Sequence, residues 1–302
     1  MTSIDTAAPV TVRGVAENAG TGVGQIFFQE SWPAGALIVL GIAVYSLPMA
    51  AMTVAGTLIA TASARLVGLP TAHGLQGYCG ALVGAAAWAT FGDPWPAALA
   101  TVLGAAACPA VTRALAWLLA LVPSSAGSLS VLTAPFCVVS GIVALLAAAI
   151  APGPAAAVAA PVAGDPLPLL GVAVLTGVSQ VVLVESWLGG LLMLAGLFVA
   201  NWRVGVAGLV GSLLGTLTAL MAGAGAATLT AGLAGYSPCL TAIGLACVFL
   251  RPGPLAWVLA AVGAVATVGV QALLALTPVP VYTWPFILTT WAMLLICRRW
   301  RG

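Results

Sequence analysis

The sequence predicts an all-α membrane protein with about ten transmembrane helices plus re-entrant segments, arranged as two inverted five-helix repeats. Composition, the placement of the arginines and an internal repeat predict this fold. Of 302 residues, 62% are hydrophobic and only 5% are charged, whereas a soluble domain carries about 25% charged residues because its surface faces water. The mean hydropathy of +1.19 agrees with a chain that lies largely in lipid.

Ten apolar stretches lie between charges and Pro or Gly breaks, each near the roughly 20 residues that cross a bilayer. The predicted spans are 26–46, 48–64, 75–91, 96–112, 131–150, 179–200, 204–222, 232–250, 254–275 and 282–297. Parts of 12–30, 66–78 and 114–123 are candidates for re-entrant segments. Residues 1–20 are expected to be a weakly structured tail, without the apolar core of a cleavable signal peptide. The two repeat halves are then 21–165 and 166–302.

The arginines test this number of spans. With a cytoplasmic N-terminus, all of them fall on one side of the membrane, as the positive-inside rule expects. They are Arg13 before the first span, Arg65, Arg113, Arg203 and Arg251 after the second, fourth, sixth and eighth, and Arg298, Arg299 and Arg301 after the tenth. We therefore expect a multi-pass plasma-membrane protein with both termini in the cytoplasm.

The chain contains two copies of one unit. The matched blocks are QIFFQESWPAGALIVLGIAV (25–44) with QVVLVESWLGGLLMLAGLFV (180–199), GLQGY (74–78) with GLAGY (232–236), and TAPF (133–136) with TWPF (283–286). Because five spans per copy is an odd number, the second copy inserts upside down, which predicts an inverted repeat. Such folds place the solute path between the repeats, so the shared blocks are candidates to line it.

These blocks resemble the urea transporter family over most of residues 20–297. The resemblance is carried by the glycine-rich signature of each half (GLQGYCGALVG at 74–84, GLAGYSPCLTAIG at 232–244), by Thr-x-Pro-Phe at 133–136 and 283–286, and by a Gln-hydrophobic-x-aromatic element at Gln25–Phe28. The signature asparagine of the family is replaced by Cys79 and Ser237, and Pro238 stands where a small residue is usual.

The resemblance implies a homotrimer with a pore through each protomer, acting as a passive channel for urea or a closely related small neutral amide. The pore it implies is a narrow slot between apolar and aromatic side chains, lined by a ladder of oxygens. By motif, the slot-lining residues are Gln25, Ile26, Phe28, Tyr78, Leu82, Thr133, Gln180, Val181, Tyr236, Leu240 and Thr283. Thr133 and Thr283 would stand at the centre, and Gln25 and Gln180 at the two mouths.

Urea is suited to such a slot because it is flat, neutral and strongly dipolar. Moving its amide groups out of water without new hydrogen-bond partners would cost about 2–7 kcal/mol per group. Carbonyl and hydroxyl oxygens along the slot can replace that water. Apolar walls offer a hydrated ion no charge in exchange for its shell, which predicts that ions are excluded.

Other roles for these residues stay open. A threonine in a membrane helix often bonds back to its own helix, a tyrosine can belong to the interfacial belt, and Leu82 and Leu240 can be core residues. Glu30 and Glu185 are interpreted as helix-end charges at the interface, with a pore-mouth carboxylate as the alternative. His73 is interpreted as a loop residue, with a vestibule position as the alternative.

The alternative functions are a channel for ammonia or another small neutral solute, and an ion-coupled secondary transporter. Ammonia channels typically carry a pair of histidines along the path, and this chain has one. Coupling usually needs an ionisable group at mid-membrane, and the acids here lie in tails, loops or span ends. No catalytic cluster, metal site or cofactor is expected, and the cysteines are interpreted as small apolar packing residues. The expected partners are urea, the bilayer and further copies of the chain, with no nucleic acid.

Overall fold

The computed structural model describes residues 12–121, 129–150, 166–297 and 299, which form helices and turns with no β-strand element among them. The first half contains α1 (Val12–Gly24), η1 (Gln25–Phe27), α2 (Trp32–Tyr45), α3 (Leu47–Leu66), η2 (Ala72–Gly74), α4 (Gly77–Phe91), α5 (Pro94–Ala120) and α6 (Ala134–Ile150). The second half contains α7 (Pro166–Ser179), η4 (Gln180–Val182), α8 (Trp187–Ala200), α9 (Trp202–Met221), α10 (Ala226–Thr230), α11 (Tyr236–Ile243), η5 (Gly244–Phe249), α12 (Pro254–Leu274) and α13 (Trp284–Ile296).

The two predicted spans 26–46 and 179–200 are not continuous helices. The segments Ala16–Phe27 and Trp32–Tyr45 meet at 79°, and Leu169–Val182 and Trp187–Ala200 meet at 75°. A polar residue causes each break, because the Ser31 and Ser186 hydroxyls accept backbone N–H bonds at the starts of α2 and α8. A side-chain oxygen in this position satisfies a donor that the helix leaves free and so fixes where the helix begins.

Each bend contains a residue in the left-handed region, Phe28 (φ 60°) or Leu183 (φ 61°). Its N–H bonds the carbonyl of Gln25 or Gln180, at 3.0 Å in both copies. A left-handed residue commonly ends a helix in this way, although it is usually glycine. The same unusual backbone therefore recurs at matched positions of the two copies.

Four helices are long and apolar enough to cross a membrane: α3, α5, α9 and α12. The number rises to six if each bent pair counts as one span. Four further apolar helices, α4, α6, α11 with η5, and α13, are shorter. The chain is therefore a multi-pass membrane protein, while helix length and composition establish four to six spans of the ten predicted.

Three predicted segments differ from the structure. The predicted tail overlaps α1, which begins at Val12, while residues 1–11 lie outside the described residues. Residues 114–120 of the re-entrant candidate 114–123 belong instead to α5, as the last two turns of a 27-residue helix that contains Pro109. Helix α7 lies almost entirely in a stretch that the sequence left between two spans, and it is the counterpart of α1 in the second half.

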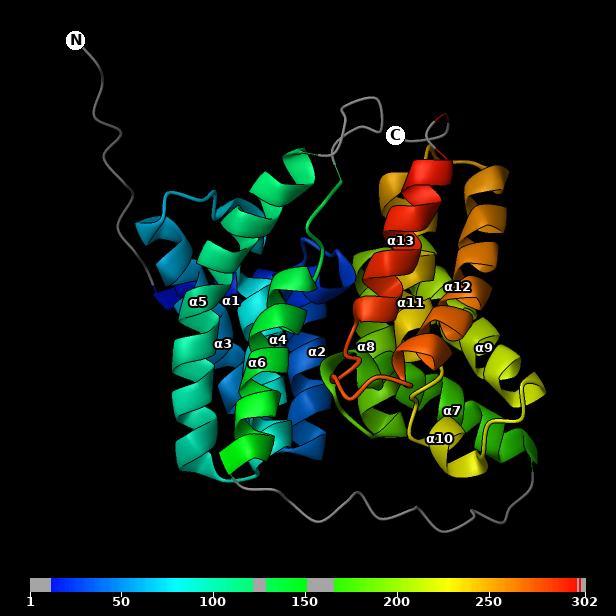
Figure 1. The fold of residues 1–302 in the computed structure, drawn as a ribbon, viewed down its shortest axis with the longest axis horizontal. Helices are drawn as coiled ribbons and strands as arrows, with labels where there is room; N and C mark the ends of the chain where they lie inside the picture. The colour runs from blue at the N-terminus through cyan, green and yellow to red at the C-terminus, as the bar shows by residue number, and fades with distance from the viewer. Residues whose placement is uncertain (1–11, 122–128, 151–165, 298, 300–302) are drawn as a thin grey trace.

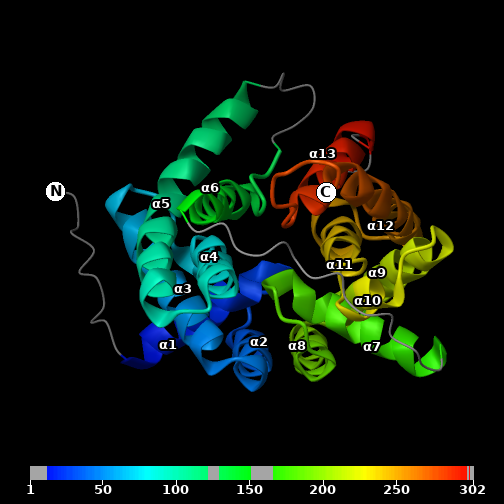
Figure 2. The same cartoon turned by 60° about the horizontal axis from the view of Figure 1, so that its bottom comes forward.

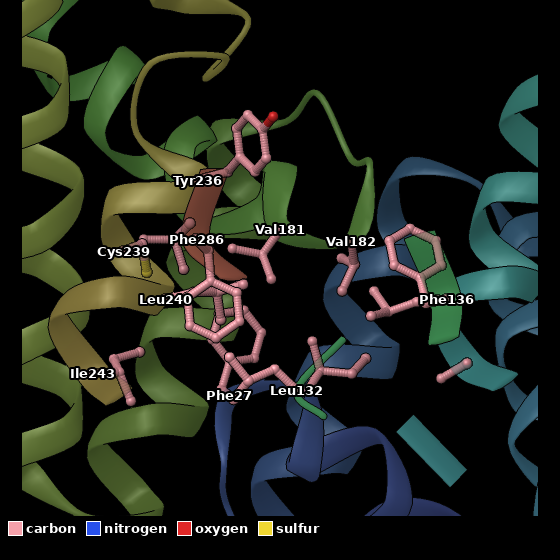
Figure 3. Close-up of a cluster of buried hydrophobic side chains, with 14 of the residues drawn as sticks. Phe27, Leu132, Phe136, Val181, Val182, Tyr236, Cys239, Leu240, Ile243 and Phe286 are labelled. Carbon is pink, nitrogen blue, oxygen red and sulfur yellow. The ribbon is translucent and has the colours of Figure 1, made fainter. Parts of the chain in front are cut away.

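The two halves meet along α2 and α8, which lie side by side in the middle of the molecule (Figures 1 and 2). Gly41 and Gly189 allow this approach, because a Cβ added to either would lie 2.8 or 2.9 Å from the carbonyl oxygen of the other. Around this crossing, buried side chains of both halves form one continuous cluster (Figure 3). The main hydrophobic cluster of the protein therefore extends across the interface between its halves.

Candidate functional site

Two cavities lie at the interface between the halves, each built from matched segments. The first cavity, about 280 Å³, is lined by Gln25, Ile26, Phe28, Glu30, Leu75, Tyr78, Ser130, Leu132, Thr133, Val248 and Phe249. The second cavity, about 220 Å³, is lined by Phe136, Gln180, Val181, Leu183, Leu233, Tyr236, Pro280, Val281, Tyr282 and Thr283. Nine of the eleven residues predicted for the slot line one cavity or the other.

The two cavities meet at a pair of threonines. Thr133 lines the first cavity, Thr283 lines the second, and their Oγ1 atoms lie 2.7 Å apart. The Sγ atom of Cys137 lies 3.1 Å from the Thr283 oxygen. All three side chains are at most 4% exposed. The structure thus places a polar cluster between two otherwise separate cavities. The sequence analysis identified its two threonines but not Cys137.

A tyrosine fixes the chain just before each threonine. The Tyr78 hydroxyl donates to the carbonyl of Leu132 at 2.7 Å, and the Tyr236 hydroxyl donates to the carbonyl of Tyr282 at the same distance. Leu132 (φ 53°) and Tyr282 (φ 38°) both have left-handed backbones. Such conformations are costly for side chains with a Cβ, so the tyrosine bonds offset part of that cost and orient the threonines that follow.

The two glutamines have different surroundings. Gln25 Nε2 donates to the carbonyl of His73 at 2.8 Å. The Oε1 atom of Gln180 is buried and has no hydrogen-bond partner among the described residues. A buried amide oxygen without a partner is costly, and Gln180 lines the second cavity. Its oxygen is therefore available to a donor that enters this cavity.

Aromatic rings form the walls. The Phe28 ring packs edge-to-face against Phe249 and Phe286 of the second half, with centroid distances of 5.6 and 6.1 Å. The rings of Phe136 and Tyr282 pack similarly at 5.1 Å beside the second cavity. Edge-to-face packing holds each ring at a fixed angle, which gives both cavities flat, rigid walls.

Ile26 and Val181 line the cavities but are each 2% exposed, whereas Leu82 and Leu240 are fully buried and line neither cavity. Figure 3 shows Leu240 in the same packed cluster as Val181, Tyr236 and Phe286. The two leucines therefore lie in the core behind the cavity walls in this structure, which was the alternative reading of their sequence positions.

The first cavity has a charged mouth. Glu30 lines it and pairs with His73, with 3.1 Å between Oε2 and Nδ1, and both side chains are more than half exposed. The place of Glu30 in the cavity lining favours the pore-mouth alternative, and its ion pair gives His73 a partner. No charged residue lines the second cavity among those described. Neither carboxylate nor imidazole reaches the threonine junction.

Residues that the sequence analysis missed share one signal. Leu132 and Tyr282 come directly before the two Thr-x-Pro-Phe elements, and Phe249 lies five residues after the second glycine-rich signature, at the end of η5. Residues that flank a repeated motif are therefore candidates for the cavity lining, in addition to the residues of the motif itself. In the described part of the chain, no three His, Cys, Asp or Glu side chains come together in a way that could hold a metal ion.

Comparison with known proteins agrees with this geometry. A family model described as "Urea transporter" matches residues 16–298. A sheep (Ovis aries) protein named "Urea transporter 1" is 35% identical over 119 residues, which is 37% of this chain and 31% of the sheep protein. A rat (Rattus norvegicus) protein of the same name is 42% identical over 84 residues, 28% of this chain and 22% of the rat protein. The aligned region spans less than a third of either relative.

Proposed function

Because the chain belongs to the urea transporter family, we propose that it is a passive channel through which urea, or a closely related small neutral amide, moves down its concentration gradient. Membership of this family makes it a transport protein rather than an enzyme. The observation that carries the channel proposal is the meeting of the two cavities at the hydrogen-bonded pair Thr133 and Thr283.

Urea would cross the protein by exchanging hydrogen bonds. It leaves water in a cavity whose lining offers glutamine amide, tyrosine and backbone oxygen atoms, and it reaches the two threonine hydroxyls at the centre. A hydroxyl both donates and accepts, so the pair can open toward the urea carbonyl or its N–H groups and then close behind it. The proposed lining is the set of eleven residues predicted from the sequence, with the two leucines acting as supports.

The same lining opposes ions. A hydrated cation at the junction would lose water and find two neutral hydroxyls and a thiol, surrounded by aromatic and aliphatic side chains. Stripping water from an ion without a compensating charge costs far more than desolvating a neutral amide. Glu30 is the charged side chain at the first mouth, and it is 57% exposed, so it lies in water rather than at the barrier.

We also propose that the ten predicted spans form two inverted repeats. Support comes from Figure 1, where α5 runs upward and α6 downward, whereas their counterparts α12 and α13 run downward and upward. Matched tyrosine bonds, left-handed turns and bends in both halves add to this support. The short helices would then be half-length partners of the bent segments, which together complete the bilayer thickness.

The assembly and its placement are part of the same proposal. We propose a homotrimer with one passage in each protomer, as the family resemblance implies. Large apolar side chains cover the outer faces of several helices, including Leu99 and Leu103 on α5 and Val258 and Val262 on α12. These faces suit lipid or neighbouring protomers. The one-sided placement of the arginines supports a plasma-membrane protein with cytoplasmic termini.

Stopped-flow light scattering of proteoliposomes tests the function. After an inward urea gradient is imposed, vesicles with the protein should re-swell faster than protein-free vesicles of the same lipid. The rate should be unchanged when sodium and proton gradients are collapsed, because no carboxylate, imidazole or basic side chain lies at the centre of the described path. Urea entry that requires an imposed ion gradient would contradict the proposal and favour a coupled transporter. Equal rates with and without protein would also contradict it.

A further inference from the structure

A second concave site lies away from the solute path, between the first turns of α9 and α12. This cavity, about 450 Å³, is lined by Trp202, Arg203, Val206, Gly253, Pro254 and Trp257. We refer to it as the Arg203 groove. Both helices begin at it, so the groove lies at the end of the helix pair rather than midway along it. In a membrane protein, that end is where lipid headgroups lie.

Arg203 supplies the positive charge of the groove. Its guanidinium carbon lies 5.6 Å from the centroid of the Trp202 ring, which orients it over an aromatic face. Within residues 12–121, 129–150 and 166–297, no carboxylate lies within ion-pairing distance of it. A planar guanidinium is well suited to phosphate oxygens, which it can bind with two parallel hydrogen bonds.

Apolar side chains continue from the groove along both helices. Val206 and Val210 follow Trp202 at four-residue intervals on α9, and Val258 and Val262 follow Pro254 in the same way on α12. Residues four apart lie on one face of a helix, so each set forms a stripe that leads away from Arg203. Val258 and Val262 are more than half exposed, at 58% and 54%.

We propose that the Arg203 groove binds an anionic phospholipid. Its phosphate lies against the guanidinium, the two tryptophans flank the glycerol region, and the acyl chains follow the valine stripes. The ligand class follows from the combination, because a free anion would use the arginine and leave the stripes uncovered, whereas a zwitterionic lipid would bring an ammonium group beside Arg203. This site is distinct from the solute path, and the proposal does not depend on which solute the channel carries.

The internal repeat offers a natural comparison. The corresponding helices of the first half begin at Leu47 (α3) and Pro94 (α5). There the side chain of Asp93 accepts the Trp95 N–H at 2.9 Å, and the residue after Leu47 is Pro48, in the place of Arg203. A carboxylate repels a phosphate. We therefore expect one anionic-lipid site per chain, in the second half only.

Native mass spectrometry of the full-length protein, delipidated in detergent, tests the site with added phosphatidylglycerol and phosphatidylcholine of identical acyl chains. The unmodified protein should retain phosphatidylglycerol preferentially. Arg203→Gln should weaken that retention about fivefold, since one basic side chain near a lipid surface is worth about 1 kcal/mol. Arg65→Gln is the matched control, because Arg65 is an exposed arginine that follows another predicted span and lines none of the described cavities. Arg203→Lys keeps the charge, so its retention of phosphatidylglycerol should lie between that of the unmodified protein and that of Arg203→Gln.

Three results would overturn the proposal, two of them from the variants and one from competition with phosphate. The first is an unchanged preference for phosphatidylglycerol in Arg203→Gln, and the second is an equal loss in Arg65→Gln. Inorganic phosphate added to the unmodified protein separates the two sources of the anion. Phosphate that displaces the lipid completely would show that only a free-anion site exists, which contradicts the lipid assignment, whereas lipid that stays bound supports it. Urea flux by Arg203→Gln in neutral-lipid vesicles should equal that of the unmodified protein, which separates this test from that of the channel.

Discussion

The Oγ1 atoms of Thr133 and Thr283 lie 2.7 Å apart, although the two residues come from opposite halves of the chain. Each hydroxyl belongs to a different cavity, so the pair is the point at which a solute would change halves. Each threonine begins a Thr-x-Pro-Phe element, and each follows a residue with a left-handed backbone. The contact thus follows from a repeated local structure.

Replacing the hydroxyls of Thr133 and Thr283 is expected to slow the permeation of urea. Thr133→Val with Thr283→Val keeps the side-chain shape but leaves a desolvated urea without two partners, each worth about 1 kcal/mol. Urea permeability, measured by light scattering on proteoliposomes, should fall about tenfold or more. Thr101→Val is the matched control, because the Thr101 hydroxyl is equally buried but bonds its own helix at Ala97. Unchanged permeability in the double variant would remove the pair from the path.

The thiol of Cys137 is expected to support Thr283. Its counterpart in the second half is Ile287, which has no polar atom, so Thr283 has a second partner while Thr133 does not. Cys137→Val should lower urea permeability about threefold, since a weak hydrogen bond at the junction is lost. Cys137→Ser should preserve it, and Ile287→Val serves as the control of similar burial. Equal effects of serine and valine would show that only packing matters at this position.

The tyrosine hydroxyls are expected to stabilise the fold as well as the path. Tyr78→Phe and Tyr236→Phe each remove one bond to a left-handed residue, which should lower the free energy of unfolding by about 1 kcal/mol. Thermal unfolding in detergent measures the change as a lower melting temperature. Tyr45→Phe at the exposed end of α2 should leave the temperature unchanged. A similar drop in all three variants would contradict a specific role for the two bonds.

The Phe28 ring is expected to exclude wider solutes. Phe28→Leu introduces the residue type found at its counterpart Leu183 and removes two edge-to-face contacts, worth about 0.5–1.5 kcal/mol each. The first cavity should widen, so the permeability of dimethylurea relative to urea should rise. The measurement is a comparison of the two solutes in one vesicle preparation. Phe198→Leu on the outer face of α8 should not alter the ratio.

The contact between the halves is expected to tolerate no added side chain. A Cβ at Gly41 would lie 2.8 Å from the Gly189 carbonyl oxygen, so Gly41→Ala should destabilise the protein by about 1–3 kcal/mol. Gly141→Ala is the matched helical control, because a Cβ there meets nothing within 4 Å. The control should be neutral or stabilising by up to about 1 kcal/mol. Thermal unfolding should therefore separate the two substitutions in opposite directions.

Much of the candidate site was predictable because it lies in repeated blocks. Gln25 and Gln180, Tyr78 and Tyr236, and the two central threonines occupy matched positions, and the pairing of their surroundings follows from the repeat. The sequence could not show that Leu82 is fully buried behind the wall, because an apolar side chain suits a pore wall and a core equally.

The bends and α7 were harder to predict for a physical reason. A window of apolar residues has the same hydropathy whether the helix continues or turns, and the turn at Leu183 uses a residue that rarely adopts φ 61°. Helix α7 begins at Pro166, and Asp165-Pro166 is a typical helix start. The alanine- and proline-rich stretch before it and the second proline at position 168 nevertheless favour a loop. The pairing of Glu30 with His73 depends on a loop path that local propensity does not determine.

Because the two cavities meet at one pair of hydroxyls, entry of a solute into the protein and its passage across the centre are separate steps. If urea crosses the protein as proposed and equilibrates between each cavity and the adjacent solution, most of the drop in its chemical potential would fall across the short junction between the cavities. Substitutions at the mouths would then alter how often a molecule reaches the junction. Substitutions at the junction would alter how quickly it crosses. Evolution could therefore adjust the transport rate of such a channel at one pair of positions.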